Sequence, residues 1–87
     1  MVHTRIKICG ITRPEDARSA ADSGADAIGL VFYPRSPRAV SVEQASEIVA
    51  SLPPFITSVA LFVDESVDEI NRVLNRVPVD MIQFFPL

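Results

Sequence analysis

The sequence contains one cysteine, Cys9, among its 87 residues. One thiol cannot form an internal disulfide, so the fold must be held together by its apolar core. Hydrophobic residues make up 48% of the chain, which suits a single globular domain, placed here at residues 1–87. A chain of this length buries only about 60 to 65% of the surface that its unfolded form exposes, so we expect a thin margin of stability.

The chain also lacks any run of basic residues. Its formal net charge is −3 and its isoelectric point is near 4.9. Surfaces that bind nucleic acids are rich in Lys and Arg, so we expect no nucleic-acid partner. The longest apolar runs are strand-sized and far below the roughly 20 residues of a membrane helix. No charged segment precedes an apolar one at the start of the chain. We therefore expect a cytoplasmic protein without a membrane partner.

Three helix starts are predicted by one repeated pattern, in which Ser or Thr is followed three residues later by Glu or Gln. This pattern is a capping box, because the hydroxyl can accept a hydrogen bond from a free N–H of the first turn. Pro14 strengthens the first start, and Gly24 can end that helix in a left-handed conformation. The pairs are Thr12 with Glu15, Ser41 with Gln44, and Ser66 with Glu69.

Apolar residues predict how these helices lie on a sheet. The second and third helices share the spacing i, i+3, i+6, i+7, i+10, which is one stripe of a helix that covers a sheet. Strands are expected near residues 5–9, 27–32, 57–63 and 80–84, the last three covered on both faces. Right-handed crossovers would make this sheet parallel, so the fold class is α/β with the order β-α-β-α-β-α-β. The stripes are Val42, Ala45, Ile48, Val49, Leu52 and Val67, Ile70, Val73, Leu74, Val77.

Cys9 ends the first predicted strand, and ligands meet the carboxyl ends of strands in parallel α/β folds. Lys7 lies two residues earlier and so shares its face. A nearby ammonium can favour the thiolate, the form that takes up protons. From position alone, Cys9 is either such a reactive group or an inert buried cysteine.

Two longer motifs resemble those of a known family. Residues 7–12 read KICGIT and residues 32–38 read FYPRSPR. With shorter matches at 23–29, 52–55 and 62–64, they resemble the N-terminal part of the phosphoribosylanthranilate isomerases. That family folds as an eight-stranded (β/α)8 TIM barrel of roughly 200 residues. The resemblance implies that this chain is the N-terminal half of such a barrel, a truncated segment.

The resemblance implies an Amadori rearrangement of N-(5-phosphoribosyl)anthranilate in tryptophan biosynthesis, a reaction that needs a general acid and a general base. It places the base at Cys9 and brings Arg38 to the anthranilate carboxylate. Lys7 is expected to help electrostatically in substrate binding. Without the resemblance, Arg38 would be interpreted as a solvated loop charge. We expect no cofactor and no metal, and a phosphosugar-anthranilate substrate as the partner.

The family's catalytic aspartate and phosphate site belong to later strands, so the resemblance implies that this chain alone is inactive. After Gln83 the family continues through an apolar residue to His-Gly, whereas this chain has Phe85 and Pro86 in those places. We interpret this change as a shifted reading frame or a shortened gene record. Open barrel edges would also invite self-association.

Two alternatives to an active isomerase remain. One is a catalytically inactive barrel fragment. The other is a noncatalytic βα module, such as a response-regulator receiver with Asp64 as phosphoacceptor. A receiver's Mg²⁺ would need carboxylates after the first strand, where this chain has Cys9 and Gly10. Asp64 therefore stays a candidate site residue only.

Overall fold

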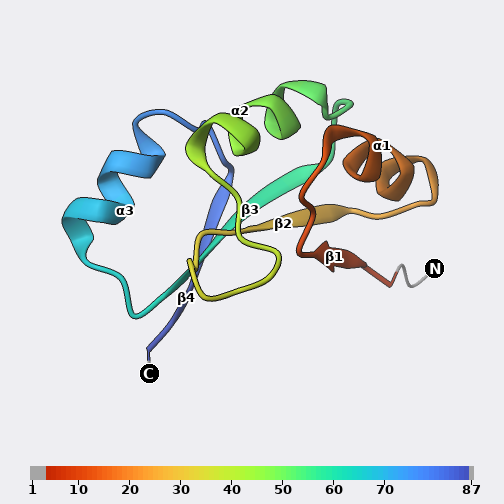
Figure 1. Cartoon of the computed structure of the whole chain (residues 1–87). Helices are drawn as coiled ribbons and strands as arrows, with labels where there is room; N and C mark the ends of the chain where they lie inside the picture. Colours follow the sequence, from red (N-terminus) through yellow and green to blue (C-terminus); the bar gives the residue numbers. More distant parts are fainter. Residues whose placement is uncertain (1–3, 87) are drawn as a thin grey trace.

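A four-stranded parallel sheet with three helices forms the computed structural model, which describes residues 4–86 (Figure 1). The strands lie in the order β1-β2-β3-β4, and every neighbouring pair is parallel. The predicted order and direction are confirmed, although β1 begins two residues later than expected. The elements are β1 (Lys7–Cys9), α1 (Pro14–Asp22), β2 (Ala27–Val31), α2 (Val42–Ser51), β3 (Thr57–Val63), α3 (Val67–Leu74) and β4 (Met81–Phe85).

The helices pack on one face of the sheet, called here the helix face. Alternate residues of β2 and β3 point into this layer, where they form one cluster with apolar side chains of the helices. Phe62 is at its centre, and its ring stacks on Phe32 with the centroids 5.4 Å apart. The other face, called here the open face, carries Lys7, Cys9 and Gly29. The buried strand residues of the cluster are Ile28, Leu30, Ala60 and Phe62.

The predicted start of α2 is confirmed, and that of α1 is wrong. Ser41 Oγ accepts a hydrogen bond from the Gln44 N–H (3.1 Å), and Gln44 Oε1 accepts one from the Ser41 N–H (2.8 Å). In α1 the N-cap residue is Arg13, without a side-chain cap. Pro14 occupies the first helical position, because its fixed φ and missing N–H suit it. Thr12 is therefore one residue too early to cap.

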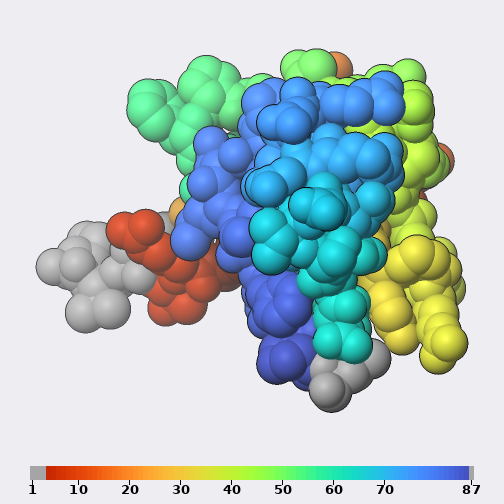
Figure 2. Space-filling model, turned by 90° about the vertical axis from the view of Figure 1, so that its left-hand side faces the viewer, coloured from red at the N-terminus to blue at the C-terminus, as the bar shows by residue number. Residues whose placement is uncertain are grey.

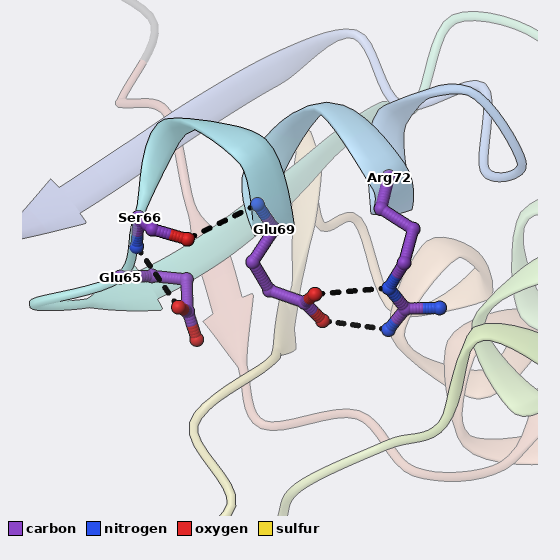
Figure 3. A network of polar contacts seen from close by, with 4 residues as sticks. All are labelled: Glu65, Ser66, Glu69 and Arg72. Carbon is purple, nitrogen blue, oxygen red and sulfur yellow. Dashed lines mark hydrogen bonds and ion pairs between the residues drawn. The ribbon is translucent and has the colours of Figure 1, made fainter.

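The predicted capping box of α3 is half formed. Ser66 Oγ accepts from the Glu69 N–H (3.2 Å), but the Ser66 N–H donates to the Glu65 carboxylate (2.9 Å) (Figure 3). The Glu69 carboxylate instead receives two hydrogen bonds from Arg72, at 2.9 and 2.6 Å. Val67, expected in the apolar stripe of α3, is 72% exposed. The stripe thus begins one turn later than its spacing predicted.

The end of α1 follows the expectation for Gly24. Its φ is +100°, and its N–H donates to the carbonyl of Ala21 (3.1 Å). The Ala25 N–H donates back to Ala20 (3.0 Å), which completes a Schellman motif. The chain can therefore turn directly into β2.

Strand β4 was expected to be covered on both faces, and this is wrong. Its two faces are about half exposed, with Met81 at 59%, Ile82 at 50% and both phenylalanines at 46%. β4 is an edge strand, and no helix follows it among residues 4–86. Figure 2 shows this dark blue segment at the molecular surface beside α3. The apolar sequence of β4 thus predicted a strand correctly, but the expectation that this strand is buried was wrong.

Candidate functional site

Cys9 is the last residue of β1 and is exposed. Its register partner on β2 is Gly29, so both lie on the open face. A Cβ atom placed on Gly29 would be 3.0 Å from Cys9 Sγ, which is closer than ordinary packing allows. Glycine at this position therefore leaves room for the thiol. The alternative interpretation, in which Cys9 is an inert buried cysteine, is wrong about burial, since the side chain is exposed.

Arg38 reaches the same edge from the loop after β2. Its Cδ lies 2.5 Å from where a Cβ of Gly10 would be, and its Nη1 lies 3.2 Å from that point. Gly10 also has φ +87°, a left-handed conformation that side chains rarely adopt. The backbone conformation thus favours glycine at this position, and the missing side chain leaves room for the Arg38 stem. Because Gly10 directly follows Cys9, the structure brings the guanidinium stem beside the β1 terminus.

Lys7 shares the open face with Cys9, as the sequence predicted, but its ammonium contacts a different group. It donates a hydrogen bond to Gln83 Oε1 on β4. The two strands are at opposite edges of the sheet, so this contact crosses β2 and β3 and requires a curled sheet. Lys7 therefore links the edges of the open face.

Asp64 directly follows β3 at the same carboxyl edge and has φ +48°. Its N–H donates to the carbonyl of Phe85 (2.8 Å), so its backbone ties the ends of β3 and β4 together. Asp tolerates this left-handed conformation better than most residues. The part that Asp64 plays in the fold is thus a turn at the end of β3.

Two hollows lie beside the sheet, and neither is lined by Cys9 or Arg38. One, of about 460 Å³, opens between α2 and α3 and is lined partly by Glu43, Glu69 and Arg72. The other, of about 470 Å³, lies on the open face and includes Lys7 and Gln83. The first is a charged groove on the outer side, and the second is the interior of the curled sheet.

The groove between α2 and α3 is lined by an ion pair between Glu69 and Arg72. The two hydrogen bonds from Arg72 lower the pKa of Glu69 below its ordinary value (Figure 3). The same bonds raise the pKa of Arg72. Both side chains are open to solvent, Arg72 at 54% and Glu69 at 36%, so their role is local support of the α3 surface.

Within residues 4–86, no group of three or more His, Cys, Asp or Glu side chains is placed to hold a metal ion. Every helix in that range is too short or too polar to span a bilayer. The chemical groups that the carboxyl edge does offer are the Cys9 thiol, the Arg38 guanidinium and the Asp64 carboxylate.

Sequence reasoning found Cys9, Lys7, Arg38 and Asp64. The structure brings Cys9, Arg38 and Asp64 to the carboxyl edge of the sheet and Lys7 to the open face. It missed Gln83, the partner of Lys7. The roles of Gly10 and Gly29 were also missed. Their signal was present in the sequence, since a glycine beside or opposite a reactive residue often marks close approach.

Comparison with known proteins gives one family. Residues 6–85 match a sequence model described as N-(5'phosphoribosyl)anthranilate (PRA) isomerase. The chain is 68% identical over 84 residues to the N-(5'-phosphoribosyl)anthranilate isomerase of Alcanivorax borkumensis. That match covers 97% of this chain and 38% of the relative. The chain thus spans about two fifths of the length of its curated relative.

Solved structures agree with the observed fold. A phosphoribosyl anthranilate isomerase in complex with reduced 1-(o-carboxyphenylamino)-1-deoxyribulose 5-phosphate superimposes with a TM-score of 0.92 at 45% identity, covering 97% of this chain and 43% of that one. Monomers generated from the dimeric enzyme of Thermotoga maritima give 0.90 at 42% identity, covering 97% and 42%. These neighbours are TIM barrels, and the chain matches part of one.

Proposed function

Because the chain belongs to the N-(5'-phosphoribosyl)anthranilate isomerase family, we propose that it carries the base and the carboxylate-binding half of an isomerase site. The substrate is N-(5-phosphoribosyl)anthranilate, and the reaction is its Amadori rearrangement in tryptophan biosynthesis. The chain spans 38% of a curated relative, so activity belongs to the completed barrel. By itself, the chain is an inactive fragment.

The proposed chemistry divides between the two halves. Protonation of the ribose ring oxygen opens the sugar to a Schiff base, and the Cys9 thiolate removes the proton from the adjacent carbon. A proton is then added at the first carbon while the hydroxyl of the adjacent carbon loses its proton and becomes the ketone, so two protons are gained and two are lost, and no oxidant or reductant is needed. The acid for ring opening and the phosphate-binding loops come from outside this chain. Losing one acid or base slows such a reaction about 10²- to 10⁴-fold.

One observation supports this assignment most directly: the Arg38 stem packs over Gly10, the residue after Cys9. A guanidinium at that position can bind a planar carboxylate through two parallel hydrogen bonds. The substrate's anthranilate group would then hold its ribose near the thiol. Lys7 is proposed to help electrostatically from the open face, whereas Asp64 is left with the turn that it forms.

Two further proposals concern the setting. We expect the isolated chain to self-associate or to stay partly molten, because edge strands and apolar surface are exposed. We also propose a cytoplasmic location, since an exposed catalytic thiol such as Cys9 needs a reducing compartment. The partner proposed for the site is the small-molecule substrate. We propose no nucleic-acid partner.

The test is a chimaera that joins residues 1–83 of this chain to the remainder of the Alcanivorax borkumensis relative. The 87-residue chain should show no measurable turnover, whereas the chimaera should be active. In the chimaera, Cys9→Ser should abolish turnover, and Arg38→Ala should mainly raise KM. An active Cys9→Ser chimaera would contradict the proposed base.

Arg35→Ala is the matched control, because Arg35 is an exposed arginine in the same loop. It should leave KM within about twofold, and each variant should unfold at the same urea concentration as the parent. An equal rise in KM for Arg35→Ala and Arg38→Ala would reduce Arg38 to a general loop charge.

A further inference from the structure

Gly29 is a glycine in the middle of a strand whose backbone does not require one. It is the central residue of β2 and is buried. Its φ lies outside the left-handed region, unlike those of Gly10 and Gly24. A glycine inside a strand weakens the strand and often marks a place where another group approaches closely. The reason for a glycine at this position therefore lies in its neighbours.

The space beside Gly29 is taken by the side chain of Cys9. The strand register lines up four residues in one row across the open face: Cys9, Gly29, Val59 and Met81. Gly29 is the gap in this row. The three heavy atoms nearest to a Cβ placed on residue 29 all belong to Cys9, with Sγ at 3.0 Å, Cα at 3.2 Å and Cβ at 3.4 Å. Cys9, rather than Val59 on the other side, thus limits what can stand at residue 29.

The backbone that follows Cys9 is held in place from two sides. The Gly29 carbonyl accepts hydrogen bonds from the N–H groups of Gly10 and Ile11, each 3.1 Å long. The Ile11 side chain is 6% exposed and belongs to the core cluster. A methyl group added at residue 29 would therefore displace the Cys9 thiol more readily than it would displace the end of β1.

We propose that Gly29 is a positioning residue for Cys9, because its missing side chain fixes where the thiol lies in the isomerase site. This role rests on the proposed function of Cys9 as the base. Heavy atoms in ordinary contact are about 3.5 to 4.0 Å apart, so an added methyl group would move the thiol by about 0.5 to 1 Å. A misplacement of about 1 Å can slow a reaction about 10²-fold. The effect of a side chain at residue 29 thus falls on the reaction step rather than on substrate binding.

Gly29→Ala is tested in the chimaera that joins residues 1–83 to the remainder of the Alcanivorax borkumensis relative. We expect kcat to fall at least about tenfold and KM to stay within about twofold, with the same urea midpoint as the parent. Ala27→Ser is the matched control, because it also adds one heavy atom to β2 on the open face. It should leave both kcat and KM within about twofold of the parent.

The position of the thiol is measured separately from activity. A crystal structure of the Gly29→Ala chimaera should show Cys9 Sγ displaced by about 0.5 to 1 Å from its place in the parent chimaera. The hydrogen bonds from Gly10 and Ile11 to the carbonyl of residue 29 should be retained. If the Cys9→Ser chimaera is active and the thiol is displaced in Gly29→Ala, the proposed base is wrong and the placement of the thiol by Gly29 stands.

The role of Gly29 is wrong if the thiol keeps its place in Gly29→Ala, or if kcat stays within about twofold of the parent. A higher KM at an unchanged kcat would also overturn it, because Gly29 would then make room for the substrate. A loss of kcat that follows a lower urea midpoint, or that Ala27→Ser shares, would reduce Gly29 to a residue that affects only the stability of β2.

Discussion

Central and edge strands differ in burial although they carry the same residue types. Phe62 on β3 and Phe84 on β4 are register partners on the helix face, yet 1% of one side chain and 46% of the other is exposed. Ile28 and Ile8 repeat the difference between β2 and β1. In each pair the buried residue has helices over it. Burial here is set by the neighbouring elements rather than by the side chain.

The largest expected effect comes from comparing the two phenylalanines directly. Phe62→Ala removes a fully packed ring that stacks on Phe32 and should cost about 3 to 5 kcal/mol of unfolding free energy, enough to unfold a small domain. Phe84→Ala removes a half-exposed ring and should cost roughly 1 kcal/mol. Urea unfolding followed by circular dichroism measures both. Equal losses of unfolding free energy in the two variants would show that Phe62 and Phe84 do not differ in how much they stabilise the fold.

The next largest effect is expected at a side-chain contact that adds to the β3–β4 ladder. The Asp80 carboxylate accepts hydrogen bonds from the Ser58 N–H (2.8 Å) and hydroxyl (3.2 Å), and Ser58 is buried. Asp80→Ala leaves both donors unsatisfied and should cost about 1 to 3 kcal/mol. Amide exchange should rise in residues 81–85 and not in β2. Asp68→Ala, at an exposed position of α3, is the control and should change neither.

The N-terminal caps of α1 and α2 are expected to differ by a smaller amount of unfolding free energy. Ser41 caps α2 through a reciprocal pair of hydrogen bonds, whereas α1 has no side-chain cap. Ser41→Ala should therefore lower stability by about 1 kcal/mol, and Thr12→Ala by only a few tenths. Thermal unfolding of the two variants makes the comparison. A larger loss for Thr12→Ala would restore the capping box that the sequence suggested.

The smallest effect concerns the Glu69–Arg72 pair on the surface. The pKa of Glu69 is lowered by hydrogen bonds from Arg72, so the stabilisation is present above the unfolded-state pKa and is lost as the pH falls through the folded one. Carboxyl titration by NMR should show a depressed pKa that returns to its ordinary value in Arg72→Gln. Since both groups are exposed, salt should weaken the shift. An unchanged titration in Arg72→Gln would remove the pair as the cause.

Much of the fold was predictable because local and global preferences agree. Apolar runs predicted all four strands, and short right-handed crossovers allow only a parallel sheet in chain order. The predicted N-cap of α1, Thr12, was one residue too early. The capping pattern at Thr12 and the preference of Pro14 for the first helical position indicated different N-caps, and the helix begins at Pro14. At the site, the alternation of side chains along a strand placed Lys7 and Cys9 together. It could not predict the contact of Lys7 with Gln83, 76 positions away.

The sequence by itself determined where strands and helices form and which residues end the strands, since these follow from periodicity and from the backbone preferences of Gly and Pro. Tertiary structure alone decided that Arg38 lies over Gly10, because that contact joins two loops whose separation depends on the β1–β2 register. It also decided which apolar residues are buried. Phe84 looks like Phe62 in sequence, but no helix follows β4 among residues 4–86, and Phe84 is half exposed.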